Sequence, residues 1–84
     1  SVDRTAPGLD IKIFPNPARD FVQVQSESLG MIYAELFDAQ GKRVQQDQFS
    51  GYGQLDLRQL SGGLFWLRFY NVKGEVICRK IIRN

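Results

Sequence analysis

The apolar residues of this chain occur in short stretches separated by turn-forming residues. The longest stretch covers residues 64–70, between a Gly-Gly pair and Asn71, and it is rich in aromatic side chains. Its length, its aromatic content and its flanking turn residues favour a β-strand over a helix. We expect this strand to lie in the middle of a sheet and to be buried on both faces or nearly so, with Phe65, Leu67 and Phe69 directed toward the core.

The other face of the same strand carries Leu64, Trp66, Arg68 and Tyr70. Trp66 and Tyr70 offer the largest apolar surface outside the expected core, so this face is a candidate binding surface. Three interpretations are open. The face could be a sugar-binding platform, a faint version of the aromatic and basic sheet face that binds RNA, or a face covered by a loop or a neighbouring domain, which is the ordinary structural outcome.

Six further segments have the alternation or the turn-bounded length of strands: residues 11–14, 21–25, 31–37, 42–49, 54–57 and 75–82. A period of two places one set of side chains on the core side of each strand. Residues 42–49 are polar apart from Val44 and Phe49, which is typical of an edge strand. Leu60 is expected to close one end of the core. The other residues expected to point inward are Val22, Val24, Ile32, Ala34, Leu36, Leu55 and Leu57.

Two turn motifs separate these segments. Pro15-Asn16-Pro17 is a rigid turn, because each proline fixes φ and lacks an N–H donor. Such a turn cannot lie in the middle of a sheet, and it fits an edge strand that changes direction or crosses between sheets. A second signal begins at Asp38, which caps its own turn, and Gly41 supplies the left-handed residue of a three- to four-residue hairpin loop with a bulge.

Seven short strands with a turn signal roughly every 8–12 residues, and no amphipathic helical pattern, predict an all-β fold. The fold class we expect is a seven-stranded antiparallel Ig-like β-sandwich, with a small open barrel as the alternative. A chain of 84 residues suffices for one small domain. Residues 1–10 have the composition of a linker, and residues 11–84 form the domain.

The chain contains no histidine and one cysteine. The lack of histidine removes the commonest general base and the commonest metal ligand. The nine acidic residues are scattered singly, and they form neither a glycosidase pair nor a calcium loop. We therefore expect no catalytic residue, no metal and no cofactor. Cys78 has no partner for an internal disulfide, and we expect it to be a small buried hydrophobic residue.

The net charge of +2 is too small to indicate nucleic-acid binding, but five basic residues and one acidic residue occur from Arg68 onward. A basic patch of this size can steer an acidic partner, or it can keep a strand edge soluble. No apolar run reaches the roughly 20 residues that span a bilayer, and we expect no direct membrane insertion. The N-terminus lacks the apolar region of a secretory signal, so a signal for export would lie upstream.

Four short motifs occur in order along residues 11–84, and each is weak alone. Together they resemble the type A C-terminal sorting domains of the type IX secretion system. One departure is Phe65, which stands where the family usually has tyrosine and lacks the hydroxyl. The motifs are residues 13–20 with Phe14, Pro15, Asn16 and Pro17; residues 36–44 with Asp38, Gly41 and Lys42; the series Leu57, Leu60, Gly63 and Phe65; and the terminal Lys80, Ile81, Ile82 and Arg83.

The resemblance implies a non-catalytic Ig-like domain at the C-terminus of a larger secreted protein. It implies a signal that takes this cargo from the periplasm across the outer membrane of Bacteroidota-type Gram-negative bacteria to the cell surface. The implied partners are the translocon and its shuttle protein. In most cargos a surface sortase of the gingipain-like cysteine-protease class then removes the domain and attaches the cargo to anionic lipopolysaccharide. Cleavage is then expected near residues 1–10.

The candidate recognition element is the terminal segment Lys80, Ile81, Ile82, Arg83 and Asn84. The segment is basic, and if it lies at a sheet edge it could pair with a receptor strand by β-augmentation or with a second copy of the domain. Core and edge packing is the ordinary interpretation of its two isoleucines. The competing functions are an adhesion or carbohydrate-binding sandwich that uses the aromatic face, and a structural spacer, which would need a continuation of the chain.

Overall fold

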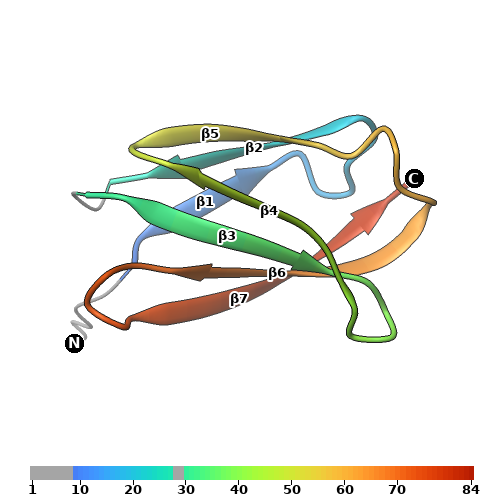
Figure 1. Cartoon of the computed structure of the whole chain (residues 1–84). Helices are drawn as coiled ribbons and strands as arrows, with labels where there is room; N and C mark the ends of the chain where they lie inside the picture. The colour runs from blue at the N-terminus through green and yellow to red at the C-terminus, as the bar shows by residue number, and fades with distance from the viewer. Residues whose placement is uncertain (1–8, 28–29) are drawn as a thin grey trace, which may run out of the picture.

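A computed structural model describes residues 9–27 and 30–84, which form seven strands and no helix. The strands are β1 (Ile11–Phe14), β2 (Phe21–Ser26), β3 (Ile32–Phe37), β4 (Arg43–Phe49), β5 (Tyr52–Asp56), β6 (Gly63–Tyr70) and β7 (Val76–Arg83). They build a three-stranded sheet of order β1-β2-β5 and a four-stranded sheet of order β4-β3-β6-β7, which are stacked as two layers (Figure 1). All pairs are antiparallel. The predicted sandwich is confirmed, and the open barrel is not formed.

Most of the predicted linker, residues 1–10, lies outside the described residues. The two described residues at its end touch the domain. Leu9 is partly buried and packs against the core, and the Asp10 carbonyl accepts a hydrogen bond from the Glu27 N–H at 3.3 Å. The start of the domain at residue 11 stays a prediction.

The core lies between the two sheets and consists of one side of each strand, as period-two alternation requires. Phe69 is fully buried and meets the Phe49 ring edge-on, with ring centroids 6.3 Å apart. Leu60 packs partly buried against this cluster, in line with its expected position at one end. All the other residues predicted to point inward are buried: Val22, Val24, Ile32, Ala34, Leu36, Leu55, Leu57, Phe65 and Leu67.

β6 lies mid-sheet between β3 and β7, as predicted, but the expectation that it is nearly buried on both faces was wrong. Its inward side chains are buried, whereas Leu64 and Trp66 on the opposite face are 38% and 44% exposed. In this two-layer fold the outer face of the four-stranded sheet has no third layer from the described residues. A continuous apolar run therefore marks the centre of a sheet here, not a strand enclosed on both sides.

Cys78 was also predicted wrongly, since the structure places it exposed on β7. β7 is the edge strand of the larger sheet, and the smaller sheet covers only part of it. Cys78 pairs with Arg68 and lies on the outer face of the larger sheet, away from the core, whereas its neighbours Ile77 and Arg79 are on the inner face. Strand limits differ from those predicted by a few residues, and the largest difference is that β5 covers residues 52–56 instead of 54–57.

Two hairpin loops of the larger sheet have the same construction. In the β3–β4 loop, Asp38 Oδ1 accepts hydrogen bonds from the N–H groups of Gln40 and Lys42 at 3.0 and 2.9 Å. Gly41 adopts a φ of 87° and donates its N–H to the Asp38 carbonyl. The predicted loop and its bulge, which falls between Leu36 and Phe37, are confirmed.

The β6–β7 loop repeats this pattern with asparagine in place of aspartate. Asn71 Oδ1 accepts from the N–H groups of Lys73 and Glu75, both at 3.1 Å. Gly74, with a φ of 87°, donates its N–H to the Asn71 carbonyl. A side-chain oxygen at the first loop position and glycine at the fourth therefore favour the registers of the two hairpins, β3–β4 and β6–β7.

Candidate recognition surface at the C-terminal end

The four sequence motifs meet at the end of the sandwich where the chain terminates (Figure 1). The turn between β1 and β2, the corner between β5 and β6, the β3–β4 loop and the end of β7 all lie there. These segments are far apart in the sequence, and the contacts between three of them, together with the pocket that the β3–β4 loop shares with the corner, are described below.

The Pro-Asn-Pro turn pairs with the outer edge of β7. Asn16 Nδ2 donates to the Lys80 carbonyl at 3.1 Å, and Asn16 Oδ1 accepts from the Ile82 N–H at 3.2 Å. Next to it, the Ala18 N–H donates to the Ile82 carbonyl at 2.7 Å, and the Asn84 N–H donates to the Ala18 carbonyl at 2.8 Å. The turn therefore leaves the edge of the smaller sheet and closes the last part of the edge of the larger one, which agrees with the expected crossing between sheets.

The proline residues explain why this segment does not continue β1. Pro15 and Pro17 have no N–H to give to a ladder, and the turn instead uses the side-chain amide of Asn16 and the backbone of Ala18. Ala18 is fully buried and forms an isolated parallel bridge with Arg83. Phe14, the residue before the turn, is 41% exposed and packs only in part.

The corner before β6 supports the end of β7 from its other side. Gly63 pairs with Arg83, and its φ of 136° favours glycine. A Cβ atom on Gly62 would lie 3.3 Å from the Arg83 carbonyl oxygen, so this corner approaches the strand closely. Phe65 is 5% exposed and packs in the core. Its ring fills this place although it lacks the hydroxyl that a tyrosine would have.

A shallow pocket of about 390 Å³ lies between the β3–β4 loop and this corner. Its lining includes Asp38 and Gln40 from the loop and Leu60, Gly63 and Phe65 from the corner and β6. The pocket joins the second and third motifs. Lys42 is exposed at the end of the loop, where its N–H bonds to Asp38.

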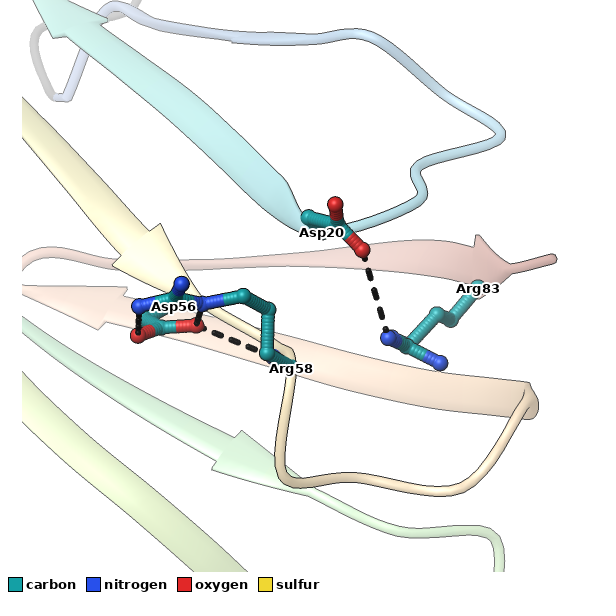
Figure 2. A network of polar contacts seen from close by, with 4 residues as sticks. All are labelled: Asp20, Asp56, Arg58 and Arg83. Atoms are coloured by element: carbon teal, nitrogen blue, oxygen red, sulfur yellow. Dashed lines mark hydrogen bonds and ion pairs between the residues drawn. The ribbon is translucent and has the colours of Figure 1, made fainter.

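A set of charged residues lies at the same end (Figure 2). Arg58 binds the Asp56 carboxylate with two guanidinium N–H groups at 2.9 and 3.0 Å and with its backbone N–H at 3.0 Å. These hydrogen bonds lower the pKa of Asp56 from 3.8 to about 2 and raise the pKa of Arg58. Both groups are exposed, so the pair adds little to stability.

Arg83 folds back onto the domain. Its guanidinium lies 3.7 Å from an Asp20 carboxylate oxygen (Figure 2), and its side chain is only 15% exposed. Its buried Nε has no hydrogen-bond partner among the residues that the structure describes. The positive charge of Arg83 therefore faces Asp20 at the start of β2, and little of it is presented to solvent.

The five residues predicted for recognition thus have different positions. Ile81 is fully buried in the core, and Arg83 is half-buried against Asp20. Lys80, Ile82 and Asn84 are exposed. The segment lies at a sheet edge, but its backbone from the Lys80 carbonyl to the Asn84 N–H already bonds to the turn residues Asn16 and Ala18.

The outer face of the larger sheet is a second exposed surface. Tyr33 and Tyr70 stack with ring centroids 5.3 Å apart, and Trp66 lies on the same side of β6 as Tyr70. A pocket of about 260 Å³ next to the stacked rings is also lined by Gln46 and Gln48 of β4. Trp66 is therefore exposed as the sequence suggested, while Tyr70 is half-buried by Tyr33.

Glu35 is a central residue of this face that the sequence analysis missed. It accepts hydrogen bonds from Arg68 at 2.7 Å and from Arg43 at 3.0 Å, and its side chain is 12% exposed. In the sequence, Glu35 is only a charged residue on the outward side of a strand. It becomes informative when the strand register places it opposite Arg68. In the described part of the chain, no three His, Cys, Asp or Glu residues gather into a group that could hold a metal ion, and no helix is long and apolar enough to cross a membrane.

No curated protein matches the chain. A family model described as a secretion system C-terminal sorting domain matches residues 12–84, which include all seven strands except the first residue of β1. The matched region also contains every residue of the four motifs that meet at the C-terminal end. The chain belongs to the C-terminal sorting domains of the type IX secretion system.

Proposed function

We propose that this type IX sorting domain, a signal that interacts with the secretion machinery and leads to the cell surface or to secretion, directs a larger cargo protein from the periplasm across the outer membrane. The translocon and its shuttle protein would recognise the exposed end of β7. The observation that carries the proposal is the contrast within this segment. Ile81 is anchored in the core, while Lys80 and Ile82 present their side chains to solvent.

The anchoring gives this segment a fixed geometry. The Pro-Asn-Pro turn holds the backbone of Lys80 and Ile82 from one side, and β6 holds it from the other. Because the segment is already ordered, its binding to a receptor costs less conformational entropy than the binding of a free tail would. The segment is therefore proposed to be recognised through side chains, together with the exposed terminal Asn84.

The domain is further proposed to be removed after export. A surface sortase would cut near residues 1–10, before β1, and attach the cargo to anionic lipopolysaccharide. The support for this step is the family relation alone. Sorting domains of this family are generally not catalytic, so the chemistry of removal would belong to the sortase.

The export test uses residues 1–84 fused to a periplasmic reporter in a type IX-competent strain. The wild-type fusion is expected at the cell surface. Replacing the two exposed side chains, Lys80→Ala with Ile82→Ser, is expected to reduce surface reporter by about tenfold, as a loss of roughly 1.4 kcal/mol in binding would. The matched control is Val72→Ser, which changes an 81% exposed residue in the β6–β7 loop at the other end of the sandwich.

Both variants must be shown to fold, by unchanged thermal unfolding of the purified domain. If the wild-type fusion stays in the periplasm, the proposed function is wrong. If the double variant brings as much reporter to the cell surface as the wild type does, the secretion machinery does not recognise this part of β7.

A second candidate function is sugar binding at the outer face of the larger sheet. The observation that favours it is the pocket beside the stacked Tyr33 and Tyr70 rings, which is lined by the amides of Gln46 and Gln48. Aromatic faces and amide groups are suitable partners for a sugar ring. Titration of the purified domain with oligosaccharides would show binding that is lost in Tyr70→Ala; the absence of any binding excludes this function.

A further inference from the structure

The outer edge of β7 is divided into a closed part and an open part. In an antiparallel strand, alternate residues direct their N–H and C=O groups to the same side. The groups of Ile82 and the carbonyl of Lys80 point away from β6, because they bond to the Pro-Asn-Pro turn. The backbone groups of Val76 and Cys78 and the N–H of Lys80 therefore point the same way.

The outward backbone groups of Val76 and Cys78 and the N–H of Lys80 have few hydrogen-bond partners among the described residues. The Cys78 carbonyl accepts a long hydrogen bond of 3.3 Å from the guanidinium of its neighbour Arg79. No other described residue pairs with the outward backbone groups of Val76, Cys78 or the Lys80 N–H. Figure 1 shows β7 as the outermost strand of its sheet, with only its last residues near the β1–β2 turn.

The side chains along the open part are basic and apolar. Arg79 and Lys80 are exposed on opposite faces of the strand, and neither is held in an ion pair with a described carboxylate. The nearest acid in sequence, Glu75, is turned toward the loop, where Asn71 Nδ2 donates to it at 2.8 Å. Val76 is 47% exposed on the same face as Trp66.

We propose that the outer edge of β7 from Val76 to Lys80 binds an extended acidic segment of a partner protein as an added strand. The inference rests on the proposed function, since the partner would be a component of the sorting machinery. The main-chain groups of the open edge would supply the ladder. Carboxylates on alternate faces of the added strand would meet Lys80 on the outer face and Arg79 on the inner face, and an apolar residue would lie beside Val76.

Charge argues for an acidic partner over a second copy of the domain. Pairing two β7 edges would bring two copies of Arg79 and Lys80 into one ribbon with no described acid between them. Like charges at such close range oppose pairing. Basic side chains on an edge also discourage random association, while an acidic strand converts the same charges into ion pairs.

The binding test uses the 84-residue chain and a synthetic peptide with two adjacent glutamates, one for each face of the strand, and a valine on the same face as the glutamate that meets Lys80. Two control peptides replace glutamate by lysine or carry N-methyl groups on alternate residues. The glutamate peptide is expected to shift the amide NMR signals of Val76, Cys78 and Lys80 and to slow modification of the exposed Cys78 thiol by N-ethylmaleimide. Neither control peptide should do so, because the first lacks the charge and the second lacks the ladder donors.

Two variants separate the ladder from the charges. Cys78→Pro removes an outward donor and leaves the β6 ladder in place, a position where proline is tolerated on an edge strand. Arg79→Glu with Lys80→Glu reverses the charge and needs no change of backbone. Each variant is expected to lower the affinity for the glutamate peptide by about tenfold or more, whereas Lys12→Glu on β1 should leave the affinity unchanged.

Three results would overturn the inference: no binding of the glutamate peptide, shifts confined to the outer face around Trp66, or a concentration-dependent dimer that involves β7. In the export assay, a surface-located wild-type fusion with an equally surface-located Cys78→Pro fusion would reject the open edge and leave the sorting function standing. A wild-type fusion that is not exported would reject the sorting function itself.

Discussion

At the residue scale, three polar side chains fix the backbone at the turns of this small domain. Asp38 and Asn71 organise the two hairpin loops, and Asn16 bridges the two sheets. Each has a short side chain whose oxygen reaches a nearby backbone N–H. Such residues are easily taken for neutral loop positions, yet each fixes a backbone path that the apolar residues do not determine.

The pH response of the domain includes one clear residue-level effect. Because hydrogen bonds from Arg58 lower the folded pKa of Asp56 to about 2 from 3.8, the stabilising contribution of this carboxylate is present above pH 3.8. It is lost as the pH falls toward about 2. NMR titration of the Asp56 carboxyl carbon should show the low midpoint, and in Arg58→Ala the midpoint should return toward 3.8. A midpoint that stays near 2 in the variant would contradict this assignment.

At the element scale, the alternation of the strands and the edge position of β4 were readable from the sequence, whereas the exposure of Cys78 on β7 was not. The inward positions of β2, β3 and β6 follow from period two, and the structure places each of them in the core. Cys78 was missed because the prediction followed the general tendency of free cysteine to be buried. Alternation points the other way, since Cys78 pairs with Arg68 on the outer face, whereas Ile81 pairs with Phe65 on the core face.

The β6–β7 loop provides an element-scale prediction. Asn71→Ala removes two hydrogen bonds to backbone N–H groups and one to Glu75, so the free energy of unfolding should fall by about 1–2 kcal/mol. Urea denaturation of the purified domain measures this. Asn71→Asp combined with Glu75→Gln keeps the acceptor oxygen, as Asp38 does in the other loop, without bringing two carboxylates together, and should recover most of the loss. Equal destabilisation by both variants would show that the side-chain oxygen is not what holds the loop.

At the scale of the whole molecule, the C-terminal end is an assembly of segments that are distant in sequence. Asn16 and Lys80, which are in contact, are 64 residues apart, and the Gly62 corner lies beside Arg83. The four motifs of the family therefore belong to one structural region. Its integrity decides how the end of β7 is presented.

The bridge made by Asn16 can be tested by hydrogen exchange. Asn16→Ala removes both of its hydrogen bonds to β7, and each is worth about 0.5–1.5 kcal/mol. The Ile82 amide, which loses its acceptor, should exchange faster, while the amide of Phe69 in the core strand should be protected as before, after correction for global stability. Unchanged exchange at Ile82 would mean that the turn does not hold this edge.

The sequence by itself determined the two-layer β architecture, the core positions and the family, because these depend on short-range alternation, on turn residues and on motifs that occur in order. Only the tertiary structure decided which stretch of the last strand is open. That outcome depends on where the Pro-Asn-Pro turn lies after the sheets have packed, and hydrogen bonds between residues more than 60 positions apart leave no periodic trace in a single sequence. The same packing turned Arg83 inward and left Lys80 and Ile82 facing solvent.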